Sequence, residues 1–178
     1  MPVFTGPRRI FLAGSSAGGY GAQLDFARVA QAFPSAEVHA LADSAQAVQP
    51  GGSLYPTWLD AWKPSLPAGC TACGNDVSAL PTWLAATYPG SRFGLLAFEQ
   101  DTVLPYYLGI TAGDLQTATL GLFASTYDPS PNARYFAQAG PGHVMLLGDL
   151  QASVGGVTLE QWLARWYGGD AAWASVKP

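Results

Sequence analysis

Charge is scarce in this chain. Only 11% of its 178 residues are Asp, Glu, Lys or Arg, against about 25% in average soluble proteins. Lys and Arg together number eight, are scattered along the chain, and leave a formal net charge of −4. Because a phosphate backbone is bound by clustered positive charge, we expect no nucleic-acid partner.

Long apolar runs are missing as well. No run approaches the roughly 18 residues that cross a bilayer, so we expect no membrane partner. The N-terminal residues carry their charges, Arg8 and Arg9, after a turn-like stretch and directly before an apolar run. A signal peptide has the reverse order. We therefore expect no signal peptide in this chain, and its localisation stays unknown.

Cysteine and histidine number only two each, which limits metal and redox chemistry. Cys70 and Cys73 form a single Cys-x-x-Cys in a stretch rich in Pro and Gly. Zinc needs about four ligands, and no second Cys or His pair stands at zinc-finger spacing. The two cysteines are free thiols or a short local disulfide, and the spacing leaves both alternatives open. We predict no metal and no cofactor.

Apolar residues, by contrast, make up 49% of the chain, and the length fits one domain over residues 1–178. Four short apolar runs predict buried strands over residues 9–13, 37–42, 93–98 and 134–137. Apolar spacing predicts helices over residues 17–33, 78–87, 111–127 and 158–167, with Ser78 and Thr158 as caps of the second and fourth. This alternation predicts an α/β fold with a mainly parallel sheet of about four strands flanked by helices.

The stretch over residues 44–74 shows no clear period. It is rich in Pro and Gly and also contains Tyr55, Trp58 and Trp62. A connection this long within a compact domain is usually a functional loop or a lid. We therefore predict a lid-like irregular insertion here.

A Gly-x-Ser-x-Gly pentapeptide, from Gly14 to Gly18 with Ser16 at its centre, joins the first predicted strand to the first predicted helix. A nucleophile elbow has this strand–turn–helix setting. Small residues two positions before and after the serine let strand and helix close tightly. The backbone N–H of Ala17 then faces any oxyanion that forms on a substrate. We predict Ser16 as nucleophile and Ala17 as oxyanion donor; a tight glycine-rich turn without chemistry is the simpler alternative.

A serine nucleophile needs a base, and histidine serves near neutral pH. His143 lies in a Gly-Pro-Gly-His loop directly after the last predicted strand, whereas His39 lies within a strand. A loop at the C-terminal end of a strand can reach a serine on a neighbouring strand. We predict His143 as the base and His39 as a core residue.

The acid of such a triad lies between serine and histidine in the chain order of this fold class. Asp101 follows the third predicted strand, at its C-terminal end. Glu99 is the alternative acid, and Asp43, after the second strand, is a further candidate. We predict that three strands deliver Ser16, Asp101 and His143 to one edge of the sheet, where open α/β sheets bind ligands.

The first strand–glycine–helix unit is also the layout of a dinucleotide site. That fingerprint needs Gly-x-Gly-x-x-Gly or Ala, but Leu24 occupies the third small position after Gly19 and Gly21. The Tyr-x-x-x-Lys of short-chain dehydrogenases is missing too. We therefore favour a hydrolase over a dinucleotide-binding enzyme.

Residues 12–21, Leu-Ala-Gly-Ser-Ser-Ala-Gly-Gly-Tyr-Gly, resemble the nucleophile region of pectin acetylesterases and Notum-like carboxylesterases, which share a Gly-Ser-Ser-Ala-Gly-Gly pattern. Shorter similarities lie at residues 41–44, at residues 101–107 and in the histidine loop. The resemblance covers most of this chain but only the C-terminal part of a family member. It implies an α/β-hydrolase fold and carboxylesterase activity, and it assigns the triad to the same serine, aspartate and histidine. It allows a secreted or periplasmic location.

The chain departs from that family at its N-terminus. Family members have several strands before the nucleophile strand, and a loop after one of them supplies a second oxyanion donor. Here about eight residues precede that strand. We expect one donor to be missing, which typically costs ~2.7–4 kcal/mol, unless the N-terminal residues, the Ser15 hydroxyl or water substitutes. We also expect strand 9–13 to lie at an exposed sheet edge, which favours a homo-oligomer formed through it.

Aromatic residues occur in segments that leave the same sheet edge as the predicted triad. Lining a cleft, they suit short-chain acyl and aryl esters and predict broad specificity. The predicted substrate-binding residues are Ser15, Tyr55, Trp58, Trp62, Trp83 and Tyr106. The sequence thus predicts a serine esterase that forms an acyl-enzyme. The alternative is a weakly active or inactive hydrolase fragment that acts as a binding module.

Overall fold

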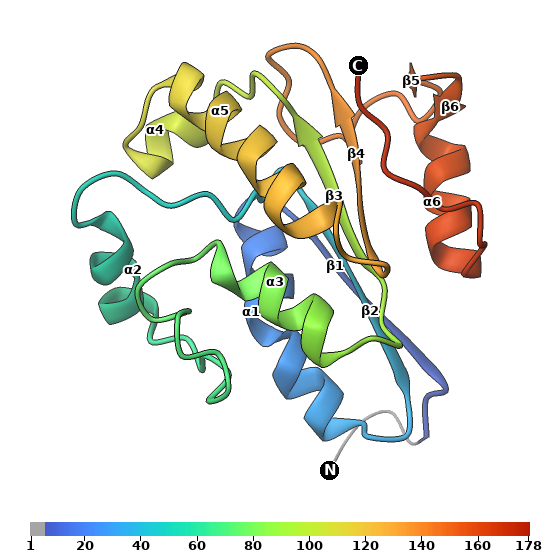
Figure 1. Cartoon of the computed structure of the whole chain (residues 1–178), viewed down its shortest axis with the longest axis horizontal. Helices are drawn as coiled ribbons and strands as arrows, with labels where there is room; N and C mark the ends of the chain where they lie inside the picture. Colours follow the sequence, from blue (N-terminus) through green and yellow to red (C-terminus); the bar gives the residue numbers. More distant parts are fainter. Residues whose placement is uncertain (1–5) are drawn as a thin grey trace.

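The centre of the molecule is a four-stranded parallel sheet (Figure 1). The computed structural model describes residues 6–178. The strands lie side by side in chain order: β1 (Arg9–Ser15), β2 (Glu37–Asp43), β3 (Phe93–Phe98) and β4 (Ala133–Gln138). All four predicted strands are found with ends within two residues of those expected. The predicted α/β class, a parallel sheet flanked by helices, is confirmed.

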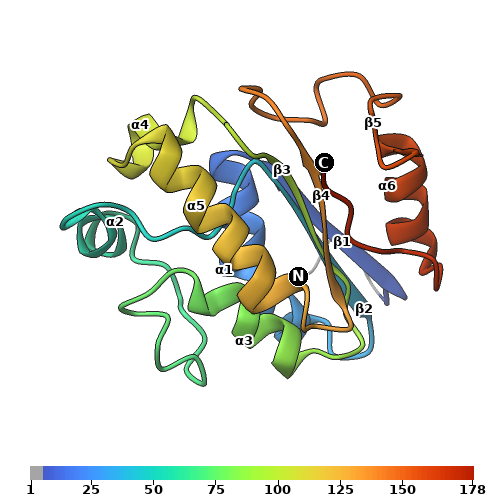
Figure 2. The ribbon, with the colours of Figure 1, turned by 45° about the horizontal axis from the view of Figure 1, so that its top comes forward.

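Helices cover both faces of the sheet, as Figure 2 shows. One face carries α1 (Ala17–Ala32), α3 (Ala79–Thr87) and α5 (Ala112–Leu122), which continues into a π-helical turn (Phe123–Tyr127). The opposite face carries α6 (Leu159–Gly168), which follows a small hairpin of β5 (Ser153–Val154) and β6 (Val157–Thr158). A short helix, α4 (Leu104–Leu108), lies between β3 and α5.

Two apolar cores hold these layers together, because successive strand residues point to opposite faces. Alternate residues such as Ala40 and Leu95 pack in the core under α1 and α3. Their neighbours Leu41 and Leu96 pack in the core under α6, around the fully buried Trp162. Burial on both faces explains why these strands read as continuous apolar runs.

Of the two predicted helix caps, one is confirmed and the other is wrong. Thr158 forms the predicted capping box with Gln161, since the Thr158 hydroxyl accepts from the Gln161 N–H and the Gln161 side chain accepts from the Thr158 N–H, both at 3.1 Å. Ser78 caps nothing. Its own N–H and hydroxyl donate to the Asp76 carboxylate instead.

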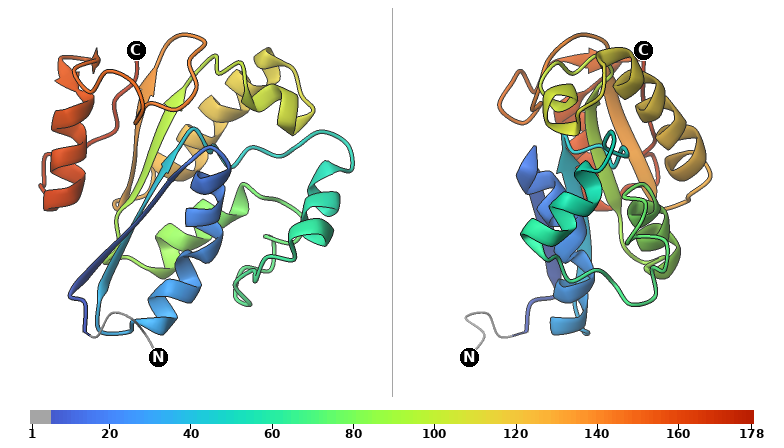
Figure 3. Two further views of the ribbon diagram at one scale, coloured as in Figure 1. Left: turned by 180° about the vertical axis from the view of Figure 1, so that it is seen from behind. Right: turned by 90° about the vertical axis from the view of Figure 1, so that its left-hand side faces the viewer.

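The segment over residues 44–74, expected to be irregular throughout, contains the helix α2 (Leu54–Trp62). Pro56 argued against a helix in this segment, but a proline is tolerated in the first turn of a helix, where the N–H has no helical partner. The start of the segment, residues 44–48, is buried in the core rather than forming part of a lid. α2 itself lies beyond α1, on the side away from the sheet (Figures 1 and 3). Farther along, Cys70 and Cys73 form a disulfide.

The two edges of the sheet differ. Along β4, the Ala137 N–H donates to Val176 and the Val176 N–H donates to Tyr135, so the C-terminal segment covers that edge. Along β1, no segment within residues 6–178 pairs with the outer edge. No helix of the described chain is long and apolar enough to cross a membrane.

Candidate active site

Ser16 occupies a sharp turn between β1 and α1. Its backbone angles are φ 53° and ψ −123°, which non-glycine residues rarely adopt. The Ser16 N–H donates to the Asp43 carbonyl at 2.7 Å, which fixes the turn against β2. This is the geometry expected of a nucleophile elbow.

Two glycines let β1 and α1 pack closely at this turn, but only one of them belongs to the predicted pair, Gly14 and Gly18. A Cβ on Gly14 would overlap the Gly18 carbonyl, and a Cβ on Gly19 would lie 2.6 Å from the Ala45 Cβ. A Cβ on Gly18 would meet nothing within 4 Å. The strand–helix contact therefore needs Gly14 and Gly19, whereas Gly18 is not needed for it.

The first turn of α1 offers donors next to the serine. The Ser16 carbonyl accepts from the N–H groups of Gly19 and Tyr20 at 2.9 and 3.2 Å. Among the described residues, the N–H groups of Ala17 and Gly18 have no hydrogen-bond partner. Free N–H groups at the N-terminus of a 16-residue helix favour an anion at this position.

Asp101 and His143 are paired. His143 Nδ1 lies 2.7 Å from Asp101 Oδ2, and the Asp101 side chain is fully buried. The other carboxylate oxygen accepts from the N–H groups of Val103 and Leu104 at 2.8 and 3.0 Å. A carboxylate held in this way assigns the proton to His143 Nδ1 and leaves Nε2 as an acceptor. Of the three candidate acids, Asp101 is the one that contacts the histidine.

The sheet brings the serine to the same side as this pair. Ser16 follows β1, Asp101 follows β3 and His143 follows β4, and the carboxyl ends of parallel strands share one edge. Throughout residues 6–178, no hydrogen bond joins the Ser16 hydroxyl to the His143 ring. Such contacts are often long without substrate and tighten when it binds.

The histidine loop is docked on the aspartate loop. The Glu99 N–H donates to the Gln138 carbonyl at 2.9 Å, and the Thr102 hydroxyl donates to the Pro141 carbonyl at 3.0 Å. Gly142 lies against the Phe98 ring, where a Cβ would come within 2.6 Å of the ring carbons. These contacts hold the part of the loop that precedes His143.

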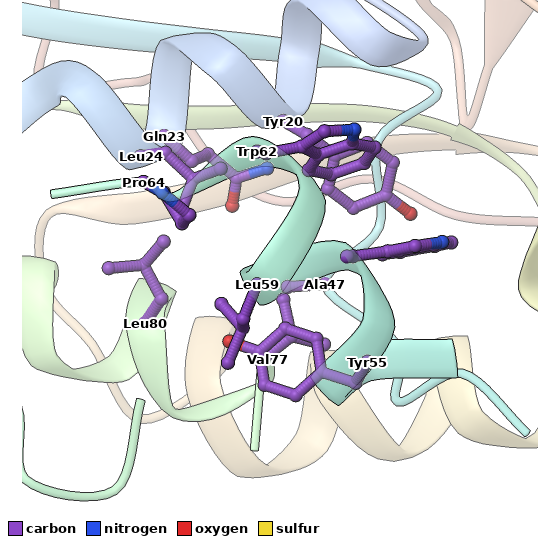
Figure 4. Close-up of a pocket in the computed structure, with 11 residues that line it drawn as sticks. Tyr20, Gln23, Leu24, Ala47, Tyr55, Leu59, Trp62, Pro64, Val77 and Leu80 are labelled. Atoms are coloured by element: carbon purple, nitrogen blue, oxygen red, sulfur yellow. The ribbon is translucent and has the colours of Figure 1, made fainter. Parts of the chain in front are cut away.

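An apolar hollow lies between α1 and α2 (Figure 4). Three predicted substrate-binding residues line it, Tyr55, Trp58 and Trp62, and the two indoles stack at 5.1 Å. Its cavity volume is about 20 Å³, which is room for about one water.

Tyr20, one helical turn after Ser16, also lines this hollow. Four residues of α-helix span about 6 Å, which is the rise along α1 from Ser16 to Tyr20. The Tyr20 hydroxyl donates to the Gln46 carbonyl at 2.7 Å, and burial and the nearby Asp101 raise the pKa of Tyr20. Sequence reasoning missed Tyr20, although its position one turn beyond the serine was a signal.

The other predicted substrate-binding residues lie elsewhere. Trp83 lines a separate open hollow with Thr82 and Thr126. Tyr106, on α4, is 82% exposed. The Ser15 hydroxyl donates to Asp43 Oδ2 at 2.9 Å, so its single proton is engaged within the protein. Within the part of the chain that the structure describes, no group of three or more His, Cys, Asp or Glu side chains is placed to hold a metal ion.

Two crystal structures of the Wnt deacylase Notum from Drosophila are similar to this fold, with TM-scores of 0.65 and 0.66 at 15% sequence identity. The match covers 95% of this chain and 56% and 55% of the Notum chains, so this chain spans little more than half their length. No protein-family model matches the chain, and no curated protein matches it in sequence. The likeness confirms the α/β-hydrolase type of fold that the family resemblance implied.

Proposed function

We propose that this protein is a serine esterase that hydrolyses short-chain carboxylic esters, with Ser16 as nucleophile, His143 as base and Asp101 as the orienting acid. One observation carries the proposal. A buried aspartate pairs with a histidine at 2.7 Å, on the sheet edge where a serine in a strand–helix turn has a backbone conformation that non-glycine residues rarely adopt.

The chemistry follows from these positions. His143 Nε2 accepts the proton of the Ser16 hydroxyl while Oγ attacks the ester carbonyl carbon. The carbonyl oxygen becomes an oxyanion and accepts a hydrogen bond from the Ala17 N–H. The Asp101 carboxylate stabilises the imidazolium. That imidazolium protonates the departing alcohol as the C–O bond breaks, which leaves an acyl group on Ser16.

The second step reverses the roles of the same groups. A water loses a proton to His143 Nε2 and attacks the acyl carbon, the oxyanion forms again at the Ala17 N–H, and the imidazolium returns the proton to Ser16 Oγ. The carboxylic acid leaves and the enzyme is restored. Each step transfers one proton and breaks one C–O bond.

The aromatic hollow supports small esters as substrates. With room for about one water, it takes no long acyl chain. Its lining of Tyr20, Trp58 and Trp62 offers apolar contact but few polar groups to select one substrate. We therefore expect broad specificity among small esters, and a steep preference for one ester would count against it.

A binding module without turnover is the second candidate. It is favoured by one observation, because the Ser15 hydroxyl is engaged by Asp43 and so does not serve as a second oxyanion donor. The loss of one such donor typically lowers turnover by about 10²–10³-fold. Slow but serine-dependent turnover is what the esterase proposal requires.

The test is release of p-nitrophenol from p-nitrophenyl acetate and butyrate. We expect Ser16→Ala to lower the enzyme-dependent rate at least about 10³-fold. Ser35→Ala, in an exposed turn before β2, is the matched control and should keep the wild-type rate. Equal slow release by the wild type and Ser16→Ala would refute the esterase and favour the binding module. Tight binding of NAD(P) would favour a dinucleotide enzyme instead.

A further inference from the structure

We infer that Asp43 is a positioning residue of this active site, and that its buried carboxylate ties the His143 loop to the strand end that carries Ser16. The inference rests on the proposed function, because positioning matters only if Ser16 and His143 react together. Asp43 is not a second catalytic acid. Within the described residues it makes no hydrogen bond to the His143 ring, which is paired with Asp101.

Asp43 lies midway between the two halves of the site. It is the last residue of β2, which runs between β1 and β3. Ser15 is its register partner on β1, and Leu96 is its partner on β3. Its side chain is completely buried, so its carboxylate is directed at the protein and not at solvent.

On one side, Asp43 holds the loop that follows the proposed base. Asp43 Oδ1 accepts from the Met145 N–H at 2.9 Å, and Oδ2 accepts from the Leu146 N–H at 3.1 Å. The next residue along, Ser44, accepts from the Val144 N–H through its hydroxyl at 2.8 Å. The N–H groups of the three residues that follow His143 are thus all bound by Asp43 and Ser44.

On the other side, Asp43 holds the nucleophile. Its Oδ2 accepts from the Ser15 hydroxyl at 2.9 Å, and its main-chain carbonyl accepts from the Ser16 N–H at 2.7 Å. One residue therefore bonds to both the serine turn and the histidine loop. These two segments are more than a hundred residues apart in the chain and share no other such link among the described hydrogen bonds.

The environment of this carboxylate argues for a specific role. Among the described residues, no cation pairs with Asp43, and its carboxylate accepts only from the hydroxyls of Ser15 and Ser44 and the N–H groups of Met145 and Leu146. Burying a carboxylate without a cation is unfavourable unless hydrogen bonds compensate. The backbone beside it is also strained, because Ser44 and the β-branched Val144 have φ of 49° and 65°. Such strain persists where surrounding bonds enforce one geometry, and it clusters at functional sites.

The two aspartates divide the positioning of the base. Asp101 bonds Nδ1 and so sets the orientation and tautomer of the ring. Asp43 sets where the loop lies, and hence the distance from His143 Nε2 to Ser16 Oγ. A displacement of about 1 Å at a reacting centre lowers rates by about 10²-fold.

The test compares Asp43→Asn with the wild type on p-nitrophenyl acetate. The amide keeps the size of the side chain but replaces one acceptor oxygen with an N–H₂ group, which opposes the donors facing it. We expect kcat to fall by about 10²-fold with KM nearly unchanged and the circular dichroism spectrum retained. Asp128→Asn, an exposed aspartate that accepts from the Tyr135 hydroxyl, removes the same charge elsewhere and should keep the wild-type kcat.

A double variant separates positioning from a merely structural role. We expect Asp43→Asn to lower kcat only where His143 serves as the base, so that adding Asp43→Asn to His143→Ala leaves the kcat of His143→Ala unchanged. An equal fall in both backgrounds, or a kcat of Asp43→Asn within threefold of the wild type, would overturn the inference. If Asp43→Asn does not fold, Ser44→Ala, which removes the acceptor of the Val144 N–H, is measured against the same two criteria. Wild-type turnover that does not depend on Ser16 would overturn the esterase and this inference together.

Discussion

At the scale of single residues, Asp101 contacts His143, and Asp43 bonds to both the serine turn and the histidine loop. Ser16, Asp101 and His143 each follow an apolar strand, and parallel strands bring such positions to one edge. The role of Asp43 left no local signal, because its partners Met145 and Leu146 are far along the chain. The pentapeptide likewise did not reveal which glycines close the elbow.

Gly19 and Gly18 make a matched pair of variants for the elbow. Gly19→Ala places a Cβ 2.6 Å from the Ala45 Cβ, and overpacking of this kind typically costs about 1–3 kcal/mol. Gly18→Ala meets nothing within 4 Å and should raise stability by up to about 1 kcal/mol through helix propensity. Urea unfolding of both variants checks this prediction, and equal midpoints would contradict it.

His39 should make stability depend on pH. Its ring packs near Phe11, and burial, together with Arg92 and Arg9 but opposed by Glu37, lowers its pKa to about 4. Between the unfolded pKa of about 6.5 and the folded value, the unfolded chain binds a proton that the folded chain does not.

The stability that neutral His39 contributes is therefore complete above the unfolded pKa. It is lost as the pH falls, and the loss in the free energy of unfolding is about 2 kcal/mol at pH 5. His39→Gln removes the titrating group and serves as the control. Unfolding free energies at pH 7 and pH 5 should differ by about 2 kcal/mol more in the wild type than in this variant. The same difference in both proteins would show that His39 does not titrate in this way.

At the scale of elements, the strands were predictable and α2 was not. Buried parallel strands show continuous apolar runs, whereas α2 buries only Tyr55 and carries Pro56 in its first turn. The π-helical turn after α5 was also beyond sequence reasoning, because its residues keep a helical pattern. Elements that depend on packing rather than on their own periodicity are the ones that the sequence did not reveal.

The disulfide should brace α2. The Tyr55 hydroxyl donates to the Cys73 carbonyl at 2.5 Å, beside the Cys70–Cys73 bond. Reduction with dithiothreitol should speed amide hydrogen exchange in α2 and in residues 63–78, while exchange in β1–β4 stays unchanged. Tyr55→Phe, which lacks the hydrogen bond, should show faster exchange in α2 even when oxidised. Equal exchange in the oxidised and reduced wild type would show that the disulfide does not support α2.

At the scale of the whole molecule, the sheet has one covered and one open edge. The Glu37 N–H donates to Arg8 and the Ser16 N–H donates to Asp43, so even-numbered residues of β1 bond β2. The N–H and C=O groups of the odd-numbered residues from 9 to 15 therefore point outward. Between Arg9 and Ser16 this edge has neither charge nor proline, the usual protections against pairing.

We predict that two copies pair through β1 and form one continuous sheet. Ala13→Pro removes an outward N–H without breaking a bond to β2, and it should yield a monomer. Ala13→Val keeps that N–H and should remain a dimer. Sedimentation equilibrium over a wide concentration range distinguishes these outcomes, and a monomeric wild type throughout would contradict the prediction.

The central claim is that Ser16 is a nucleophile activated by His143, and covalent labelling tests it most directly. The folded protein is treated with a small fluorophosphonate, and the modified residue is located by peptide mass spectrometry. We predict a single adduct on Ser16, absent from Ser16→Ala and formed far more slowly in His143→Ala. An unmodified wild type, or an adduct that forms at the same rate without His143, would contradict the account.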